Sequence, residues 1–244
     1  MNLVILEERD LAGASEATLT AARADHLLRV LKVAPGDTVR VGVLDGPLGV
    51  GTVESTVGGR VTLRCVFDGG TPPRPAVDVM IALPRPKVMR RLWAQLAALG
   101  VGQIILTNAE RVERQYFDTH VVTETYYRPL LIEGLQQARD TRLPAVSIHR
   151  QFKVLVEDRL DTLFAGGVRL VADPGAPAAV AAALSTHRGE RVLIAIGPEG
   201  GWNAFELALL QAHGFHPVGI GPRTLRVDTA CVALLAVVHA ATRT

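Results

Sequence analysis

The sequence has little of several features that mark special classes of protein. Cysteine occurs only twice, at Cys65 and Cys231, which excludes a disulfide framework and matches no zinc spacing. The longest apolar stretch, residues 230–241, is interrupted by His239 and falls short of the roughly 20 residues that cross a membrane. Residues 1–9 resemble a strand more than a secretory signal. We therefore expect a cytoplasmic protein with no membrane segment.

Net charge is also small, because 26 Lys and Arg face 24 Asp and Glu, which leaves +2. No overall basic field therefore marks a nucleic-acid binder. The charges are unevenly placed, however. Residues 1–70 hold seven basic and nine acidic side chains, whereas the remainder holds nineteen and fifteen. A surface that binds anions is accordingly expected downstream of residue 70.

The length of 244 residues and the hydrophobic fraction of 48% are those of a globular protein with one large or two modest domains. Residues 39–66 contain short β-branched runs separated by Asp45-Gly46 and Gly58-Gly59, a pattern typical of hairpins. A helix is expected before them, at residues 21–31. Residues 69–75 are too rich in glycine and proline to continue a sheet. We predict a β-rich domain at residues 1–70 and a second domain at residues 76–244.

The second domain alternates apolar strands with helical patterns. Six strands are expected, each followed by a helix, and Gly100 is expected to end the first helix. The helices are expected near residues 87–99, 130–138, 152–160, 177–184, 204–213 and 228–241. Such alternation predicts an α/β fold with a mostly parallel sheet and helices on both faces. The strands are expected near residues 77–83, 103–107, 145–149, 168–172, 191–197 and 216–221.

A glycine-rich turn, IGPEGGWN at residues 196–203, leaves one of these strands and enters a helix. Ligands of open α/β sheets bind at the carboxyl ends of strands. Asn203 and Glu206 have the spacing of a capping box, which predicts a helix from Ala204 to Gly214. The turn lacks the glycine pattern of dinucleotide sites and the Lys-Ser/Thr of a P-loop, and Glu199 would repel phosphate. It is either a ligand site or only a tight turn.

A second turn of the same kind, GIGPRTLRVDTA at residues 219–230, also joins a strand to a helix, so the two turns predict one shared pocket. Arg223 and Arg226 oppose the dipole of the following helix, which favours binding of an anion or of developing negative charge. Asp228 either caps that helix or takes part in the chemistry.

A third candidate is a scattered set of basic residues, which is either solvated surface or a phosphate-binding face. Metal binding is disfavoured, because Gly214 interrupts the helix between His213 and His216. Cys231 lies inside an apolar helix, which disfavours a nucleophilic cysteine. The basic residues that we assign to RNA binding are Arg29, Lys32, Arg85, Lys87, Arg139, Arg142 and Arg223.

Together, IGPEGG and GPRTLRVDTA resemble paired motifs of the RsmE family, SPOUT-class methyltransferases that act on N3 of a uridine in 16S ribosomal RNA. The resemblance covers nearly the whole chain, since residues 26–46 look like the PUA-like segment of the family and Lys87 fits the start of its catalytic domain. It implies an α/β domain with a trefoil knot, the cofactor S-adenosyl-L-methionine, a homodimer, and ribosomal RNA or the small ribosomal subunit as partner, with no metal.

For such a reaction N3 has to lose its proton, and Arg226 is our candidate for stabilising the uracil anion that forms, while either Glu199 or Asp228 takes the proton or holds the arginine. The residues that the resemblance implies in cofactor binding are Ala172, Asp173, Pro174, Ile196, Gly197, Pro198, Glu199, Gly200, Gly201, Ile220, Leu225 and Arg226.

The chain also departs from the pattern of the family. Gln136 replaces an acidic residue in the stretch 133–140, whose arginine is displaced, and Val227 and Asp228 replace Thr and Glu. These changes leave two alternatives open. One is a divergent methyltransferase with a different RNA target, and the other is a catalytically silent RNA-binding protein of ribosome assembly.

Overall fold

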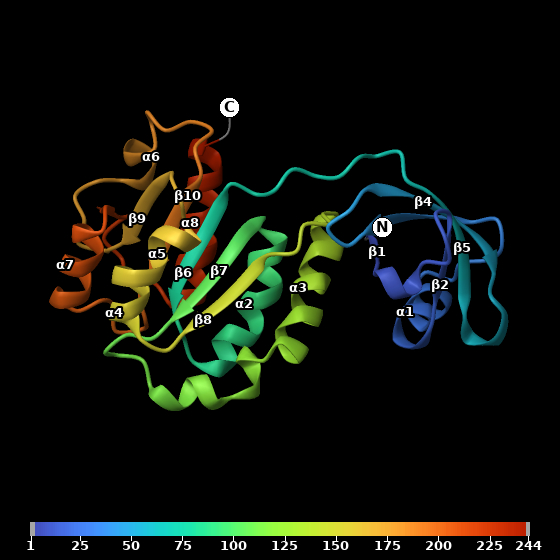
Figure 1. Cartoon of the computed structure of the whole chain (residues 1–244), viewed down its shortest axis with the longest axis horizontal. Helices are drawn as coiled ribbons and strands as arrows, with labels where there is room; N and C mark the ends of the chain where they lie inside the picture. Colours follow the sequence, from blue (N-terminus) through green and yellow to red (C-terminus); the bar gives the residue numbers. More distant parts are fainter. Residues whose placement is uncertain (1–2, 243–244) are drawn as a thin grey trace. The chain divides into compact units, whose positions relative to one another are not determined.

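The structure is a computed structural model that describes residues 3–242 (Figure 1). The chain forms two compact units. The first contains the chain up to Arg74 together with Ile132–Leu143, and the second contains Pro75–Leu131 and the chain from Pro144 onward. Residues 132–143, which the sequence analysis assigns to the second domain, thus belong to the first unit.

The first unit is built on a five-stranded sheet with the order β1-β3-β4-β5-β2. Only β1 and β3 pair in parallel, and the other pairs are antiparallel. Alternate residues of the strands face a core that includes Leu6, Leu19, Val41 and Leu63. A helix, α1 followed by the wider turn η2, covers this core through Leu27. The elements are β1 (Val4–Leu6), η1 (Glu8–Asp10), β2 (Glu16–Leu19), α1 (Ala21–Asp25), η2 (His26–Val30), β3 (Thr38–Val43), β4 (Leu48–Ser55), η3 (Val57–Gly59) and β5 (Val61–Val66).

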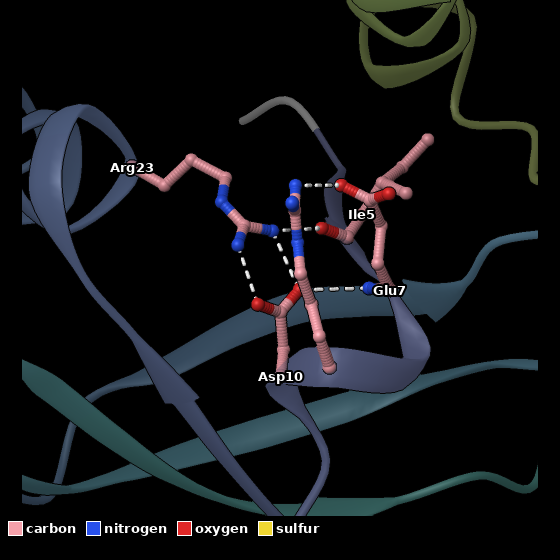
Figure 2. A network of polar contacts seen from close by, with 5 residues as sticks. Ile5, Glu7, Asp10 and Arg23 are labelled. Carbon is pink, nitrogen blue, oxygen red and sulfur yellow. Dashed lines mark hydrogen bonds and ion pairs between the residues drawn. The ribbon is translucent and has the colours of Figure 1, made fainter.

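A charged network fastens α1 to the start of the chain (Figure 2). Asp10 is only 7% exposed, and both of its oxygens accept hydrogen bonds from the guanidinium of Arg23, one of them at 2.6 Å. The same carboxylate accepts the backbone N–H of Glu7 at 2.8 Å. The hydrogen bond from Arg23 therefore compensates for the burial of the Asp10 charge.

Residues 132–143 are held in the first unit by backbone and side-chain hydrogen bonds. The N–H of Leu3 donates to the carbonyl of Gln136 at 3.0 Å, and the N–H of Asp45 donates to Thr141 at 2.8 Å. Arg142 donates from Nε to the carbonyl of Pro72 at 2.6 Å and from Nη1 to the carbonyl of Asp45 at 3.1 Å. These bonds join the segment to the β3–β4 turn and to the linker.

The second unit is built on a six-stranded sheet with the order β11-β9-β10-β6-β7-β8, in which every pairing is parallel. All residues of β6 and β10 are buried, which is expected of central strands whose two faces are both covered. The predicted parallel α/β sheet is thereby confirmed. Its strands are β6 (Val77–Ala82), β7 (Val101–Thr107), β8 (Ala145–His149), β9 (Val168–Ala172), β10 (Val192–Ile196) and β11 (Phe215–Val218).

Helices and short turns link these strands. The C-terminal helix α8 packs against α2, α6, β6 and β10, so the end of the chain lies against its middle (Figure 1). Gly100 ends α2 as predicted, with a φ of 72°. The elements are α2 (Pro86–Ala98), η4 (Arg114–Asp118), η5 (His120–Val122), α3 (Glu124–Ala138), α4 (Phe152–Val154), η6 (Leu155–Arg159), α5 (Leu160–Leu163), α6 (Val180–Ala183), α7 (Ala204–Ala212) and α8 (Val227–Thr242).

Candidate functional site

The second unit contains a cavity at the carboxyl ends of β9, β10 and β11. It brings together the two glycine-rich turns and the segment after β9, as their common position at one edge of the sheet predicts. Ten of the twelve residues implied in cofactor binding line it. They are Ala172, Asp173, Pro174, Ile196, Gly197, Pro198, Glu199, Gly201, Ile220 and Leu225.

The first turn is shaped by close contacts with the residues that follow it. A Cβ on Gly197 would lie 3.2 Å from atoms of Trp202, so a larger residue would crowd this ring. The predicted capping box is present: the N–H of Glu206 donates to the side chain of Asn203, and the N–H of Asn203 donates to Glu206, both at 2.8 Å. Helix α7 therefore begins directly after the turn.

The segment after β7 forms hydrogen bonds with this turn and with the helix that follows it. Arg111 donates from Nη1 to the carbonyl of Gly200, which does not line the cavity, and also to Gly201 at 3.5 Å. The N–H of Glu110 donates to Glu206 Oε1 at 2.7 Å. Glu206 is only 3% exposed, so one buried carboxylate joins the start of α7 to the segment after β7.

The second turn is anchored only at its start. Gly219 exchanges backbone hydrogen bonds with Ala178 and Val180, at 2.9 and 3.2 Å. Within residues 3–242, the amides of residues 220–225 form no backbone hydrogen bond with another segment. Gly221 has a φ of 129°, which a residue with a side chain rarely adopts. The turn thus presents its polar backbone groups towards the cavity or the solvent.

Asp228 is engaged in an ion pair. Its Oδ2 accepts a hydrogen bond from Arg91 of α2 at 2.6 Å, and its Oδ1 accepts the N–H of Thr229 at 3.0 Å. The hydrogen bond from Arg91 is the main reason that the pKa of Asp228 lies below its ordinary value. A carboxyl with a lowered pKa is a weaker base, and this one already has a cationic partner.

Glu199 and Arg226 are placed differently. Glu199 lines the cavity, is exposed, and accepts the backbone N–H of Arg85 at 3.3 Å. Arg226 is exposed, lies next to the first residue of α8, and is not part of the cavity lining. Its guanidinium forms no hydrogen bond or ion pair with the described part of the chain. It is therefore available to a ligand outside the cavity.

The residues predicted to bind RNA are divided between the two units. Arg29, Lys32, Arg139 and Arg142 belong to the first, and the other three belong to the second. Arg142 donates to two carbonyls, which gives it a structural role within the first unit. Arg223 lines the cavity. Exposed side chains are those of Arg29, Lys32, Arg85, Lys87, Arg139 and Arg223.

Helix α8 contributes a wall of the cavity that the named cofactor-binding residues do not include. Val227, Ala230 and Leu234 face the cavity at intervals of three and four residues, the spacing of one side of a helix. That periodicity was the available signal. Gly219, Gly221 and Thr224 also line the cavity and belong to the second turn, which was predicted to border it, although they were not named as individual binding residues. Val218, at the end of β11, lines it as well.

Three further observations concern metal ligands, membrane spans and the cysteine of α8. Among the described residues there is no group of three or more side chains that could hold a metal ion. No helix in residues 3–242 is long and apolar enough to cross a membrane. Cys231 is fully buried, and this burial raises the pKa of its thiol to about 12, which keeps it protonated and unreactive.

Comparisons with known proteins agree with this architecture. A family model described as an RNA methyltransferase domain matches residues 72–239. Ribosomal RNA small subunit methyltransferase E of Treponema pallidum is 30% identical over 98% of this chain and 91% of its own length. The protein of the same name from Synechocystis is 30% identical over 91% of this chain and 72% of its own length.

Among solved structures, ribosomal RNA small subunit methyltransferase E from Neisseria gonorrhoeae, bound to S-adenosyl methionine, shares the fold with a TM-score of 0.79. It is 19% identical and is covered over 97% of its chain and 98% of this one. Since the family model spans more than half of the chain and the relatives match along nearly all of it, the chain belongs to the RNA methyltransferase domain family, among the ribosomal RNA small subunit methyltransferase E proteins.

Proposed function

We propose that this protein transfers a methyl group from S-adenosyl-L-methionine to N3 of a uridine in 16S ribosomal RNA. The observation that carries the proposal is the cavity in which two glycine-rich turns and the segment after β9 meet. Family membership supports the reaction, and the S-adenosyl methionine bound to the Neisseria gonorrhoeae protein supports the cofactor.

The lining suits an adenosyl group. Apolar side chains such as Ile196, Leu225 and Leu234 could cover the adenine ring, while turn amides and the carboxylate of Asp173 offer polar contacts. The cavity has a volume of about 100 Å³. Small-molecule sites usually measure roughly 300–1,000 Å³, so residues 220–225 would move outwards as the cofactor enters. Their lack of backbone hydrogen bonds to other segments is consistent with such movement.

The bound cofactor would supply an electrophilic methyl group on a sulfonium. Uridine N3 is a poor nucleophile while it carries a proton, so the protein has to remove that proton and hold the base in line with the methyl group. Arg226, an exposed cation next to the cavity, would stabilise the negative charge that develops on the uracil.

Glu199 is the better candidate for the proton acceptor. Its carboxylate lines the cavity and accepts only a backbone N–H, from Arg85. Asp228 is paired with Arg91, which lowers its pKa and its basicity. Asp228 would instead fix the start of α8 and so position Arg226 two residues before it. This assignment chooses between the two acids that the sequence leaves open.

Three finer features belong to the same proposal. The packing of α8 against α2, α6, β6 and β10 is consistent with a trefoil knot in the second unit. The small, mostly antiparallel sheet of the first unit is consistent with a PUA-like RNA-binding domain. Val232 of α8 is 37% exposed and lies near exposed alanines, an apolar face suited to a homodimer contact. A cytoplasmic location would bring the protein to its ribosomal substrate.

The test is methyl transfer from labelled S-adenosylmethionine to small ribosomal subunits that lack native modifications, followed by mass spectrometry of the nucleosides. We expect the label in 3-methyluridine. Label in another nucleoside would support a divergent RNA target. Binding of S-adenosylhomocysteine without any transfer would refute the proposed reaction, and absence of both would support a catalytically silent RNA-binding protein.

The assigned roles are tested by two variants in the same assay. Arg226→Ala should lower kcat about 10²–10³-fold, the usual cost of losing one group that stabilises transition-state charge, with little change in cofactor affinity. Glu199→Gln should reduce the rate more than Asp228→Asn does at neutral pH. Equal losses of transfer and cofactor binding in Arg226→Ala would remove this arginine from the catalytic role.

A further inference from the structure

A groove lies at the carboxyl ends of β7 and β8, outside the cavity described above. Two adjacent hollows of about 340 and 360 Å³ share Asn108 and Arg114 in their walls, and together they are here called the β7–β8 groove. Each hollow is within the size range of small-ligand sites, roughly 300–1,000 Å³. In Figure 1 this edge of the sheet points towards α4, which follows β8 directly.

The groove carries cations, and one of them has no partner. Arg114 forms no ion pair or hydrogen bond through its side chain with any residue between 3 and 242. Arg150 is already bound to Asp118 at 2.9 Å, and Lys153 lies 3.8 Å from Glu157. Since Arg114 borders both hollows, its charge is positioned to bind an anion lying in either of them.

Two further groups suit a nucleotide. The Oδ1 atom of Asn108 is buried and finds no hydrogen-bond partner in the described chain, although such an acceptor costs stability unless a donor reaches it. Phe205, in the first turn of α7, is 59% exposed at the wall of the groove. An exposed ring provides a surface on which a base can stack. Arginine, amide and aromatic ring are the side chains that contact phosphate, base edge and base face.

Hydrogen bonds connect the segment that borders the groove to the turn that borders the cavity. The segment that carries Asn108 and Arg114 also contains Arg111, which donates to Gly200 and Gly201 in the first glycine-rich turn, residues 196–203. Asn203 and Glu206, which cap α7 after that turn, border the groove. A strand of RNA in the groove would therefore lie against the same turn that borders the cavity.

We propose that the β7–β8 groove binds single-stranded RNA next to the nucleotide that is modified, with Arg114 on a phosphate, Asn108 on a base edge and Phe205 stacked on a base. This inference rests on the proposed function and extends it, since the groove provides a path for the substrate. Glu110, which also borders the groove, would repel phosphate, so the phosphate contact is assigned to Arg114.

The experiment compares Arg114→Gln and Phe205→Ala with a control variant, Arg188→Gln. Arg188 is exposed, has no side-chain partner in the described chain, and precedes β10, at the amino ends of the strands, whereas the groove lies at their carboxyl ends. Binding of a short, uridine-rich, fluorescein-labelled single-stranded RNA is measured by anisotropy at several salt concentrations. Calorimetry with S-adenosylhomocysteine measures cofactor affinity, and methyl transfer to unmodified small subunits gives KM and kcat.

We expect Arg114→Gln to weaken RNA binding about tenfold and to reduce the salt dependence by about 0.7 in log–log slope, the share of one phosphate. Phe205→Ala should weaken binding roughly 5- to 150-fold, as stacking of one base predicts. Both variants should raise KM for RNA and leave cofactor affinity unchanged, and Arg188→Gln should resemble the wild type.

Two results would overturn the inference, and they differ in whether the proposed function fails as well. If wild-type protein binds the cofactor and methylates RNA while both groove variants keep wild-type RNA affinity and salt dependence, the groove is not an RNA site but the proposed function stands. If the wild-type protein binds neither the cofactor nor RNA, the proposed function fails together with the groove. A tryptophan fluorescence unfolding curve equal to that of the wild type shows that the variants are folded.

Discussion

Replacing Glu206 by alanine should destabilise the second unit far more than replacing its capping partner does. The Glu206 carboxylate is 3% exposed and accepts N–H groups from Asn203 at 2.8 Å and from Glu110 at 2.7 Å. Each hydrogen bond to a charged group contributes about 1.5–3 kcal/mol, so the loss of both in Glu206→Ala should lower the free energy of unfolding by about 3–6 kcal/mol. Asn203→Ala removes one cap bond and should cost about 1 kcal/mol.

Urea unfolding followed by tryptophan fluorescence measures this difference. The only two tryptophans, Trp93 and Trp202, are both buried in the second unit, so their fluorescence reports on that unit alone. With an m-value of about 2 kcal/mol per molar urea, a loss of about 4 kcal/mol lowers the midpoint by about 2 M. Glu206→Gln, which keeps one acceptor, should fall between the two alanine variants. A loss in Glu206→Ala no larger than that in Asn203→Ala would refute the reasoning.

Two further predictions concern charge and pH. Arg23→Ala should lower the free energy of unfolding of the first unit by about 2–4 kcal/mol, because it leaves the buried Asp10 carboxylate without its cation. The loss should be seen as faster labelling of the buried Cys65 thiol, followed by peptide mass spectrometry. The control is Arg9→Ala, which removes an exposed ion pair and should cost under about 0.5 kcal/mol. Burial, aided by the charge of Arg159, holds the pKa of His149 below its usual 6.5. As the pH falls below that value, the unfolded chain therefore binds a proton that the folded chain does not, and the folded state loses stability. The urea midpoint of the wild type should decrease as the pH is lowered from about 7.5 to 5.5, and should decrease more than that of His149→Asn; equal decreases would contradict this assignment.

Much of the second unit could be predicted from the sequence because its strands are short runs rich in apolar residues, and the central strands β6 and β10 are buried along their whole length. The turn at residues 196–203 was predictable for a similar reason, since glycines after a buried strand and an Asn203–Glu206 cap are local signals. A shared edge of a parallel sheet then implies that turns after different strands meet. The resemblance to a known family added the chemistry, which no local pattern supplies.

Other features depend on contacts that local patterns do not encode. Strand β2, residues Glu16–Leu19, contains only one β-branched residue and was missed because it forms by pairing with β5. Helix α3 begins at Glu124, whereas the prediction placed its start at residue 130. The prediction was late because Pro129, which usually lies near the start of a helix or outside it, lies inside this one. The helix expected at residues 177–184 is a single turn, Val180–Ala183.

The roles of the two acids illustrate the same limit at the site. Asp228 and Glu199 look alike in the sequence, as carboxylates within glycine-rich turns. The partner of Asp228 is Arg91, which is 137 positions away in the sequence, and only the packing of α2 against α8 brings them together.

The interleaving of the two units along the chain has a consequence for synthesis. The chain leaves the first unit at Arg74, returns to it at Ile132–Leu143, and leaves it again. During translation the five strands of its sheet emerge early, but the segment that supplies Thr141 and Arg142 emerges only after β6, α2 and β7. Neither unit is therefore encoded by one uninterrupted stretch, and a nascent chain cannot complete the first before much of the second has left the ribosome.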